Sequence, residues 1–157
     1  MEKLATSKEL MFSQINVDSQ KTLFQIICGK ALEKGFVKAE FYQDLLEREE
    51  TYPTGLDTPI PMAIPHVGTH CCQSFLSLAT LKTPIEFEKM DGSEGTLPVR
   101  IVIMFGIVNP NEQVEVLQKL SCLFQNKPFL EKLAQAPNSD ALLAVLDEVL
   151  ENLFVVL

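Results

Sequence analysis

The run VRIVIMFGI, residues 99–107, constrains the fold of this chain more than any other segment. Apart from Arg100 and Gly106 every residue in it is apolar, and β-branched residues dominate. Such a run is typical of a strand that is buried on both faces of a sheet. Because each face then needs a cover, the run predicts a central strand with helices packed on both sides.

Helical patterns stand before this strand. Residues 19–34 predict a helix that Ser19 caps and Gly35 ends, with an apolar stripe of Leu23, Ile26, Ile27 and Ala31. Residues 38–50 predict a second helix, with Phe41, Leu45 and Leu46 facing inward. Pro53 and Gly55 then break the chain.

Helical patterns also follow the strand. Asn109 and Pro110 predict a helix start, after which Val114, Leu117, Leu120 and Phe124 form the expected inner face. Two more helices are expected over residues 128–135 and 139–152, with Ser139 capping the last and Leu142, Leu143, Leu146, Val149 and Leu150 facing inward.

The rest of the chain predicts strands and loops. Residues 75–81 predict a strand, residues 85–87 a short or edge strand, and residues 62–64 an extended segment in a proline-rich loop. The first 15 residues are expected to be a loose lead-in. Together the elements predict an α/β fold in which helices flank a sheet on both faces.

Composition narrows the class of function. The 157 residues suit a single domain spanning 1–157. A net charge of -8 argues against nucleic acid as a partner, because binding phosphates needs clustered Lys and Arg. No segment is apolar for long enough to predict membrane insertion. Four cysteines without a C-x-x-C pair indicate no secreted disulfide framework, so we expect a cytoplasmic protein.

The chain has two histidines, His66 and His70, and both lie in the loop IPHVGTHCC. Histidine suits reversible phosphoryl transfer near neutral pH, because the neutral imidazole is a nucleophile. Such a site needs a free ring nitrogen, a partner for the other nitrogen, and donors for the phosphoryl oxygens. The residues alone assign neither the tautomer of His66 nor a role to His70.

Several segments together resemble a known family. They are LEREETYPTGL (46–56), MAIPHVGTH (62–70), PIEF (84–87), IVIMFGIV (101–108) and NEQVEVLQKLSCLF (111–124). In this order and spacing they resemble the EIIA proteins of the bacterial phosphoenolpyruvate-dependent sugar phosphotransferase system, of the fructose and mannitol class. The resemblance covers about residues 9–150. It implies a mixed sheet of about five strands flanked by helices, the phosphotransferase/anion transport protein fold.

The resemblance also implies the site. The phosphorylated histidine of the family follows the proline of A-I-P-H, here His66, and its arginine partner is here Arg48. Many members carry a second histidine at the start of the helix after the central strand, where this chain has Gln113. That departure is most similar to the galactitol-specific subgroup, which makes galactitol or a related polyol the expected substrate.

By the same resemblance, phospho-HPr donates the group to Nε2 of His66, and a cysteine of an EIIB subunit takes it. The EIIC membrane subunit is then an indirect partner, and neither a metal ion nor another cofactor is needed. Catalysis in such a carrier is mostly positioning and charge stabilisation. The sequence leaves open which sugar is transported and in which oligomeric state the protein works.

Three other interpretations remain open. His66, His70, Cys71 and Cys72 carry metal-ligand atoms, but only the H-x3-H spacing of the two histidines suits zinc. Cys72 with His70 could form a thiol nucleophile, although no acid or oxyanion loop of a known type accompanies it. A nitrogen-type regulatory protein of the same fold could instead bind partners according to the phosphorylation of His66.

Overall fold

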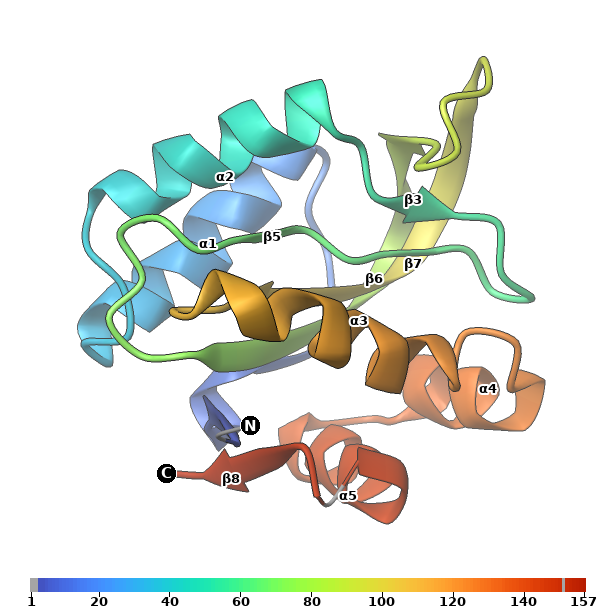
Figure 1. Cartoon of the computed structure of the whole chain (residues 1–157). Helices are drawn as coiled ribbons and strands as arrows, with labels where there is room; N and C mark the ends of the chain where they lie inside the picture. Colours follow the sequence, from blue (N-terminus) through green and yellow to red (C-terminus); the bar gives the residue numbers. More distant parts are fainter. Residues whose placement is uncertain (1–2, 151) are drawn as a thin grey trace.

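The computed structural model describes residues 3–150 and 152–157, and a mixed β-sheet forms its centre (Figure 1). Two long antiparallel strands dominate this sheet, β6 (Phe75–Glu88) and β7 (Thr96–Gly106). The strand order is β3-β4-β7-β6-β1-β8, while β2 also pairs with β6 and β5 also pairs with β7. β7 therefore pairs with the long antiparallel strand β6 on one side and with the short strands β4 and β5 on the other.

The other strands are short. They are β1 (Leu4–Thr6), β2 (Met11–Ile15), β3 (Gly55–Leu56), β4 (Met62–Ala63), β5 (His66–Val67) and β8 (Phe154–Val156). The described residues thus form an eight-stranded sheet, more than the expected count of about five. The difference arises because two- and three-residue strands lack a length over which a period of two can be recognised.

Helices cover both faces of the sheet, which confirms the predicted α/β fold (Figure 1). One face packs against α1 (Gln20–Glu33) and α2 (Glu40–Thr51). The other face packs against α3 (Gln113–Ser121), α4 (Lys127–Gln135) and α5 (Ser139–Leu150). Along β7, Val102 and Met104 enter the first core, and Ile101, Ile103 and Phe105 enter the second. The central strand is therefore buried on both faces, as its sequence predicts.

The expected loose lead-in is wrong where the structure describes it. β1 pairs in parallel with β6 and β8, and β2 pairs in parallel with β6, with Met11 beside Leu78. A short 3-10 turn, η1 (Lys8–Leu10), joins the two strands, and Leu10 is fully buried. The partners of these strands are more than 60 residues away or near the C-terminus, so no local pattern indicates them. Residues 1–2 lie outside the described part.

The first two helices follow the prediction closely. The Ser19 side chain accepts a hydrogen bond from the backbone N–H of Thr22, which caps α1. Gly35 follows α1 with φ of +77°, a conformation that glycine adopts without strain. The expected stripe is wrong at one position, since Ile26 is exposed while Ile27 and Phe24 are buried.

The later helices differ from the prediction in register and capping. A 3-10 turn, η2 (Pro110–Glu112), precedes α3. Leu117, Leu120 and Phe124 pack against the core as predicted, but Val114 is 62% exposed and Val116 is buried instead. The side chain of Asn138, rather than Ser139, caps α5 by accepting the N–H of Ala141. Val149 is exposed, contrary to expectation. α5 ends at Leu150, and residue 151 of the expected 139–152 helix lies outside the described residues.

None of the helices in the described part of the chain is long and apolar enough to span a membrane.

Candidate active site

His66 is the first residue of β5, and its backbone is fixed by the central strand. β5 pairs in parallel with β7, with His66 beside Phe105 and Val67 beside Gly106. The backbone N–H of Phe105 donates to the carbonyl of Pro65 at 3.1 Å. The imidazole stacks on the ring of Phe105, with centroids 4.6 Å apart and planes within 3°. The ring is therefore held by the strand on its backbone side and by an aromatic ring on one face.

The hydrogen bonds of the imidazole define its tautomer. Nδ1 lies 2.7 Å from the carbonyl oxygen of Ile64. Because a carbonyl can only accept, Nδ1 carries the proton and donates it. In the neutral ring Nε2 then has a free lone pair, and it lies 3.1 Å from the amide nitrogen of Gln113, which donates to it. Nε2 is thus the nucleophilic nitrogen of the site.

The surroundings keep this ring neutral. Burial lowers the pKa of His66, since a desolvated imidazolium is disfavoured, and the positive charge of Arg48 lowers it further. The hydrogen bond to the Ile64 carbonyl raises the pKa of His66, but by less than burial and Arg48 together lower it. A lowered pKa leaves the imidazole uncharged at neutral pH, as a nucleophile requires.

The three predicted site residues line one cavity. It has a volume of about 410 Å³, and His66, which is only 5% exposed, forms part of its wall beside Arg48 and Gln113. The remaining lining residues are Thr51, Tyr52, Pro53, Thr54, Lys89, Met90, Gly92 and Leu117. Three separate elements bring the predicted residues together, since Arg48 is in the last turn of α2, His66 begins β5 and Gln113 begins α3.

The cavity is cationic and partly apolar. Arg48 and Lys89 both line it, and no carboxylate is among the described lining residues. The guanidinium of Arg48 lies over the ring of Tyr52, with the central carbon 5.3 Å from the ring centroid. Tyr52 and Met90 are exposed apolar side chains of the same cavity. Such a site suits a small anion that a second protein presents.

His70 lies elsewhere and has different partners. Its Nδ1 contacts a carboxylate oxygen of Asp44, and its Nε2 lies 3.6 Å from Glu40. Its backbone is in the left-handed region, with φ of +57°. The Thr69 hydroxyl also donates to Asp44. These contacts tie the loop after β5 to α2, and His70 does not line the cavity of His66.

The geometry does not support the metal or thiol interpretations. No group of three or more His, Cys, Asp or Glu side chains within residues 3–150 and 152–157 could hold a metal ion. Cys72 is exposed, and the ring nitrogens of His70 contact Asp44 and Glu40 rather than a thiol. Cys71 Sγ donates to the carbonyl of Gln73. Burial raises the pKa of Cys71 to about 11, so that thiol is protonated at neutral pH.

Sequence reasoning missed three residues that shape the site. Phe105 supplies the stacking ring, and Lys89 adds a second cation to the cavity. Thr54 lines the cavity and hydrogen bonds to Glu49. Phe105 is part of the predicted central strand, and Thr54 and Glu49 belong to the quoted motif LEREETYPTGL. The motif therefore pointed to Thr54 and Glu49, but it carried no information on the contacts that these two residues make.

Comparison with known proteins identifies relatives over most of the chain. The sequence model of the family described as "Phosphoenolpyruvate-dependent sugar phosphotransferase system, EIIA 2" matches residues 5–149. The galactitol-specific EIIA component of Escherichia coli K12 is 29% identical over 125 residues, covering 78% of this chain and 82% of that protein. The mannitol-specific enzyme IIA component of Bacillus subtilis is 24% identical over 91% of this chain and 96% of its own length.

Some relatives are regulators rather than enzyme components. The transcriptional regulator ManR of Bacillus subtilis is 27% identical over 145 residues, which is 90% of this chain. The chain spans only 21% of the length of that regulator. The likeness thus concerns one part of a much longer protein.

Solved structures share the fold. The nitrogen regulatory protein IIA-Ntr of Neisseria meningitidis superposes with a TM-score of 0.72 at 26% identity, over 91% of this chain and 96% of that one. The enzyme IIA chain in the complex of mannitol enzymes IIA and phosphorylated IIB from Escherichia coli gives a TM-score of 0.73 at 22% identity. It covers 92% of this chain and 99% of that chain.

Proposed function

Because this chain belongs to the EIIA 2 family of the phosphoenolpyruvate-dependent sugar phosphotransferase system, we propose that it is a phosphoryl carrier whose acceptor atom is Nε2 of His66. Phospho-HPr is the donor and a cysteine of an EIIB subunit the next acceptor, in the cytoplasm. The observation that carries this proposal is the tautomer of His66. Its Nδ1–H is donated to the Ile64 carbonyl, so Nε2 carries the lone pair, which accepts from Gln113 in a cavity shared with Arg48.

The transfer step is consistent with this geometry. Nε2 of His66 attacks the phosphorus of phospho-HPr, a new N–P bond forms, and the old N–P bond breaks with its electron pair returning to the donor imidazole. Positive charge develops on the His66 ring, and the Ile64 carbonyl that accepts its Nδ1–H stabilises that charge. Transfer to EIIB reverses these changes at His66, with a thiolate sulfur as the attacking atom.

The other cavity residues have roles in this step. Arg48 carries a planar set of donors that suits phosphoryl oxygens, and its stacking on Tyr52 restricts where the guanidinium lies. Gln113 loses its bond to Nε2 when phosphorus arrives there, and its freed amide can donate to a phosphoryl oxygen instead. No proton has to pass through Gln113, because Nδ1 keeps its own.

The expected partner and substrate rest on relatives. The complex of mannitol enzymes IIA and IIB supports an EIIB subunit as the acceptor, with the EIIC membrane subunit as an indirect partner. The galactitol-specific relative, together with Gln113 in place of a second histidine, supports galactitol or a related polyol as the sugar.

A second candidate function is regulation. The likeness to part of the regulator ManR supports a module whose partner binding depends on the phosphorylation of His66. The two candidates differ in the fate of the phosphoryl group on His66. A carrier passes the group to an EIIB cysteine, whereas a regulatory module keeps it until it is returned or hydrolysed.

The experiment is phosphorylation of the purified chain with phosphoenolpyruvate, Enzyme I and HPr, followed by addition of EIIB. We expect an acid-labile adduct that His66→Ala abolishes and His70→Ala retains. Arg48→Ala should slow labelling by about 100-fold or more, as loss of one transition-state donor does. Arg100→Ala is the matched control, because Arg100 is exposed and does not line the cavity. Undiminished labelling of His66→Ala would overturn the carrier proposal, and a label that no EIIB accepts would favour regulation.

A further inference from the structure

Glu49 is a buried carboxylate beside the candidate site. It follows Arg48 in the last turn of α2 and is only 6% exposed. Both of its oxygens accept from one residue, since Oε2 receives the backbone N–H of Thr54 at 2.7 Å and Oε1 receives the Thr54 hydroxyl at 2.8 Å. None of the salt bridges among the described residues includes Glu49. The two hydrogen bonds from Thr54 are therefore the interactions that stabilise the Glu49 carboxylate.

The hydroxyl of Thr54 connects this carboxylate to the histidine-bearing strand. It accepts the backbone N–H of Ile64 at 3.2 Å while it donates to Glu49. The carbonyl of the same Ile64 accepts Nδ1–H of His66 at 2.7 Å. Thr54 and Ile64 are both almost fully buried, so water does not compete for these groups. A continuous set of hydrogen bonds thus runs from Glu49 to the imidazole.

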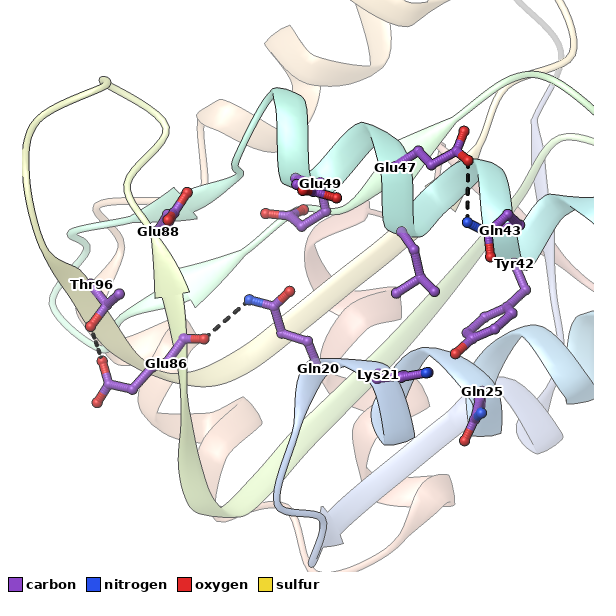
Figure 2. A pocket seen from close by; sticks show the side chains of 12 residues that line it. Gln20, Lys21, Gln25, Tyr42, Gln43, Glu47, Glu49, Glu86, Glu88 and Thr96 are labelled. Atoms are coloured by element: carbon purple, nitrogen blue, oxygen red, sulfur yellow. Dashed lines mark hydrogen bonds between the residues drawn. The ribbon is translucent and has the colours of Figure 1, made fainter.

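The surroundings of Glu49 do not favour a buried negative charge, so a contribution to folding stability does not explain why a carboxylate is found there. Glu49 lines a cleft of about 790 Å³. Figure 2 shows it among the lining side chains together with Glu47, Glu86 and Glu88. Like charges and burial both disfavour an ionised carboxylate there. An apolar side chain of similar volume would avoid that cost, but it would leave the N–H and hydroxyl of Thr54 without their acceptor.

We propose that Glu49 and Thr54 are positioning residues, which fix the Ile64 carbonyl so that His66 keeps Nδ1–H and presents Nε2 to the cavity beside Arg48. The same bonds fix the end of α2, since Glu49 is the neighbour of Arg48 in the chain. One cluster therefore sets the distance between the nucleophile and the cation, although neither Glu49 nor Thr54 acts on the phosphoryl group. The catalytic part of this inference rests on the proposed phosphoryl-carrier function, whereas the effect on the tautomer does not.

The test compares Thr54→Val with Thr54→Ser and with a matched control. Valine keeps the volume and removes the hydroxyl, and serine restores it. Thr58→Val is the control, because Thr58 is similarly buried on the other side of β3 but its hydroxyl donates to the carbonyl of Ile60. Circular dichroism checks that each variant folds. If Thr54→Val does not fold, Thr54→Ala replaces it, because alanine also lacks the hydroxyl that accepts the Ile64 N–H, and the same outcomes are expected of it.

The first readout is ¹⁵N NMR of the imidazole, which needs no phosphoryl donor. We expect the ratio of the Nδ1–H to the Nε2–H tautomer of His66 to fall about threefold to tenfold in Thr54→Val. Thr54→Ser should restore the ratio, and Thr58→Val should leave it unchanged. An unchanged ratio in Thr54→Val, or a fall that serine does not reverse, would overturn the proposal.

The second readout is the rate of phosphorylation by phospho-HPr. Misplacement of the ring should lower kcat about tenfold to 100-fold in Thr54→Val. KM for phospho-HPr should stay within about twofold, because neither residue belongs to the exposed surface that a partner contacts. A rise in KM with unchanged kcat would contradict positioning. If the wild type itself accepts no phosphoryl group while the tautomer ratio still responds, the carrier function fails and the positioning role stands.

Discussion

The stability of this protein should depend on pH through one buried carboxyl group, that of Glu49. Burial raises its pKa from 4.5 to about 7, and the negative charge of Glu88 adds to the rise, while the two hydrogen bonds from Thr54 oppose it. A raised pKa means that the folded state binds this proton more tightly than the unfolded chain does. The contribution to stability is therefore complete below about pH 4.5 and is lost as the pH rises through about 7.

The size of the effect can be worked out from the two pKa values. A rise from 4.5 to about 7, at about 1.4 kcal/mol for each pH unit, corresponds to about 3 kcal/mol. About 2 kcal/mol of this is lost between about pH 5.5 and 8.5, because the unfolded chain is already mostly ionised at the lower limit. That range also avoids the sequence pI of about 4.7, near which a chain of low net charge tends to precipitate.

The assay is urea unfolding of the wild type and Glu49→Gln at several pH values in that range. Glutamine resembles the protonated carboxyl group, since its oxygen can accept the Thr54 N–H and its amide can donate to the Thr54 hydroxyl. Subtracting the variant's free energy of unfolding removes the contribution of every other titrating group. We expect the difference to change by about 2 kcal/mol in favour of the variant as the pH rises. A difference that stays constant within about 0.5 kcal/mol would refute the reasoning.

Three further predictions concern local packing, capping and thiol chemistry. Gly55→Ala should lower the free energy of unfolding by about 2 kcal/mol or more in urea titrations, since an added Cβ would lie 2.5 Å from the backbone oxygen of Glu88; an unchanged midpoint would contradict the close approach. Ser19→Ala should cost about 1 kcal/mol in thermal unfolding, because it removes the cap of α1, and Ser19→Asn should recover most of it. Ellman's reagent should modify the exposed Cys72 quickly in the native protein, while Cys28, whose pKa burial raises to about 12, should react only on unfolding.

Local sequence patterns predicted the parts of the fold that local physics determines. The apolar run of β7, the Ser19 cap of α1 and the proline-bounded loop before His66 are all properties of neighbouring residues. The resemblance to EIIA proteins then placed Arg48 and Gln113 with His66, and the structure brings these side chains into one cavity. The spacing of the motifs was sufficient to select these three residues. Each of them is at the start or near the end of a helix or strand.

The failures have a common physical origin in long-range contacts. β1 and β8 are short and come from opposite ends of the chain. β8 pairs with β1, with Leu4 beside Phe154, and β1 also pairs with β6, with Ala5 beside Phe75. In α3, Val114 is exposed and Val116 is buried, and which of these two valines faces the sheet depends on how the helix packs. Neither effect can be recognised from apolar periodicity alone. The hydrogen bond from Thr54 to Glu49 also cannot be predicted from the sequence, because a threonine in a loop has no preferred partner.

The distribution of charge explains how a chain with a net charge of -8 could hold a phosphoryl group. Five glutamates, at positions 47, 49, 50, 86 and 88, line the cleft on one side of α2. The cavity of His66, on the other side of the same helix, contains Arg48 and Lys89 and no described carboxylate. A phosphoryl group carries about -1.5 to -2 charges at neutral pH, which these two cations balance. Under the proposed function, Gln113 would add a hydrogen-bond donor to the phosphoryl group without a further charge.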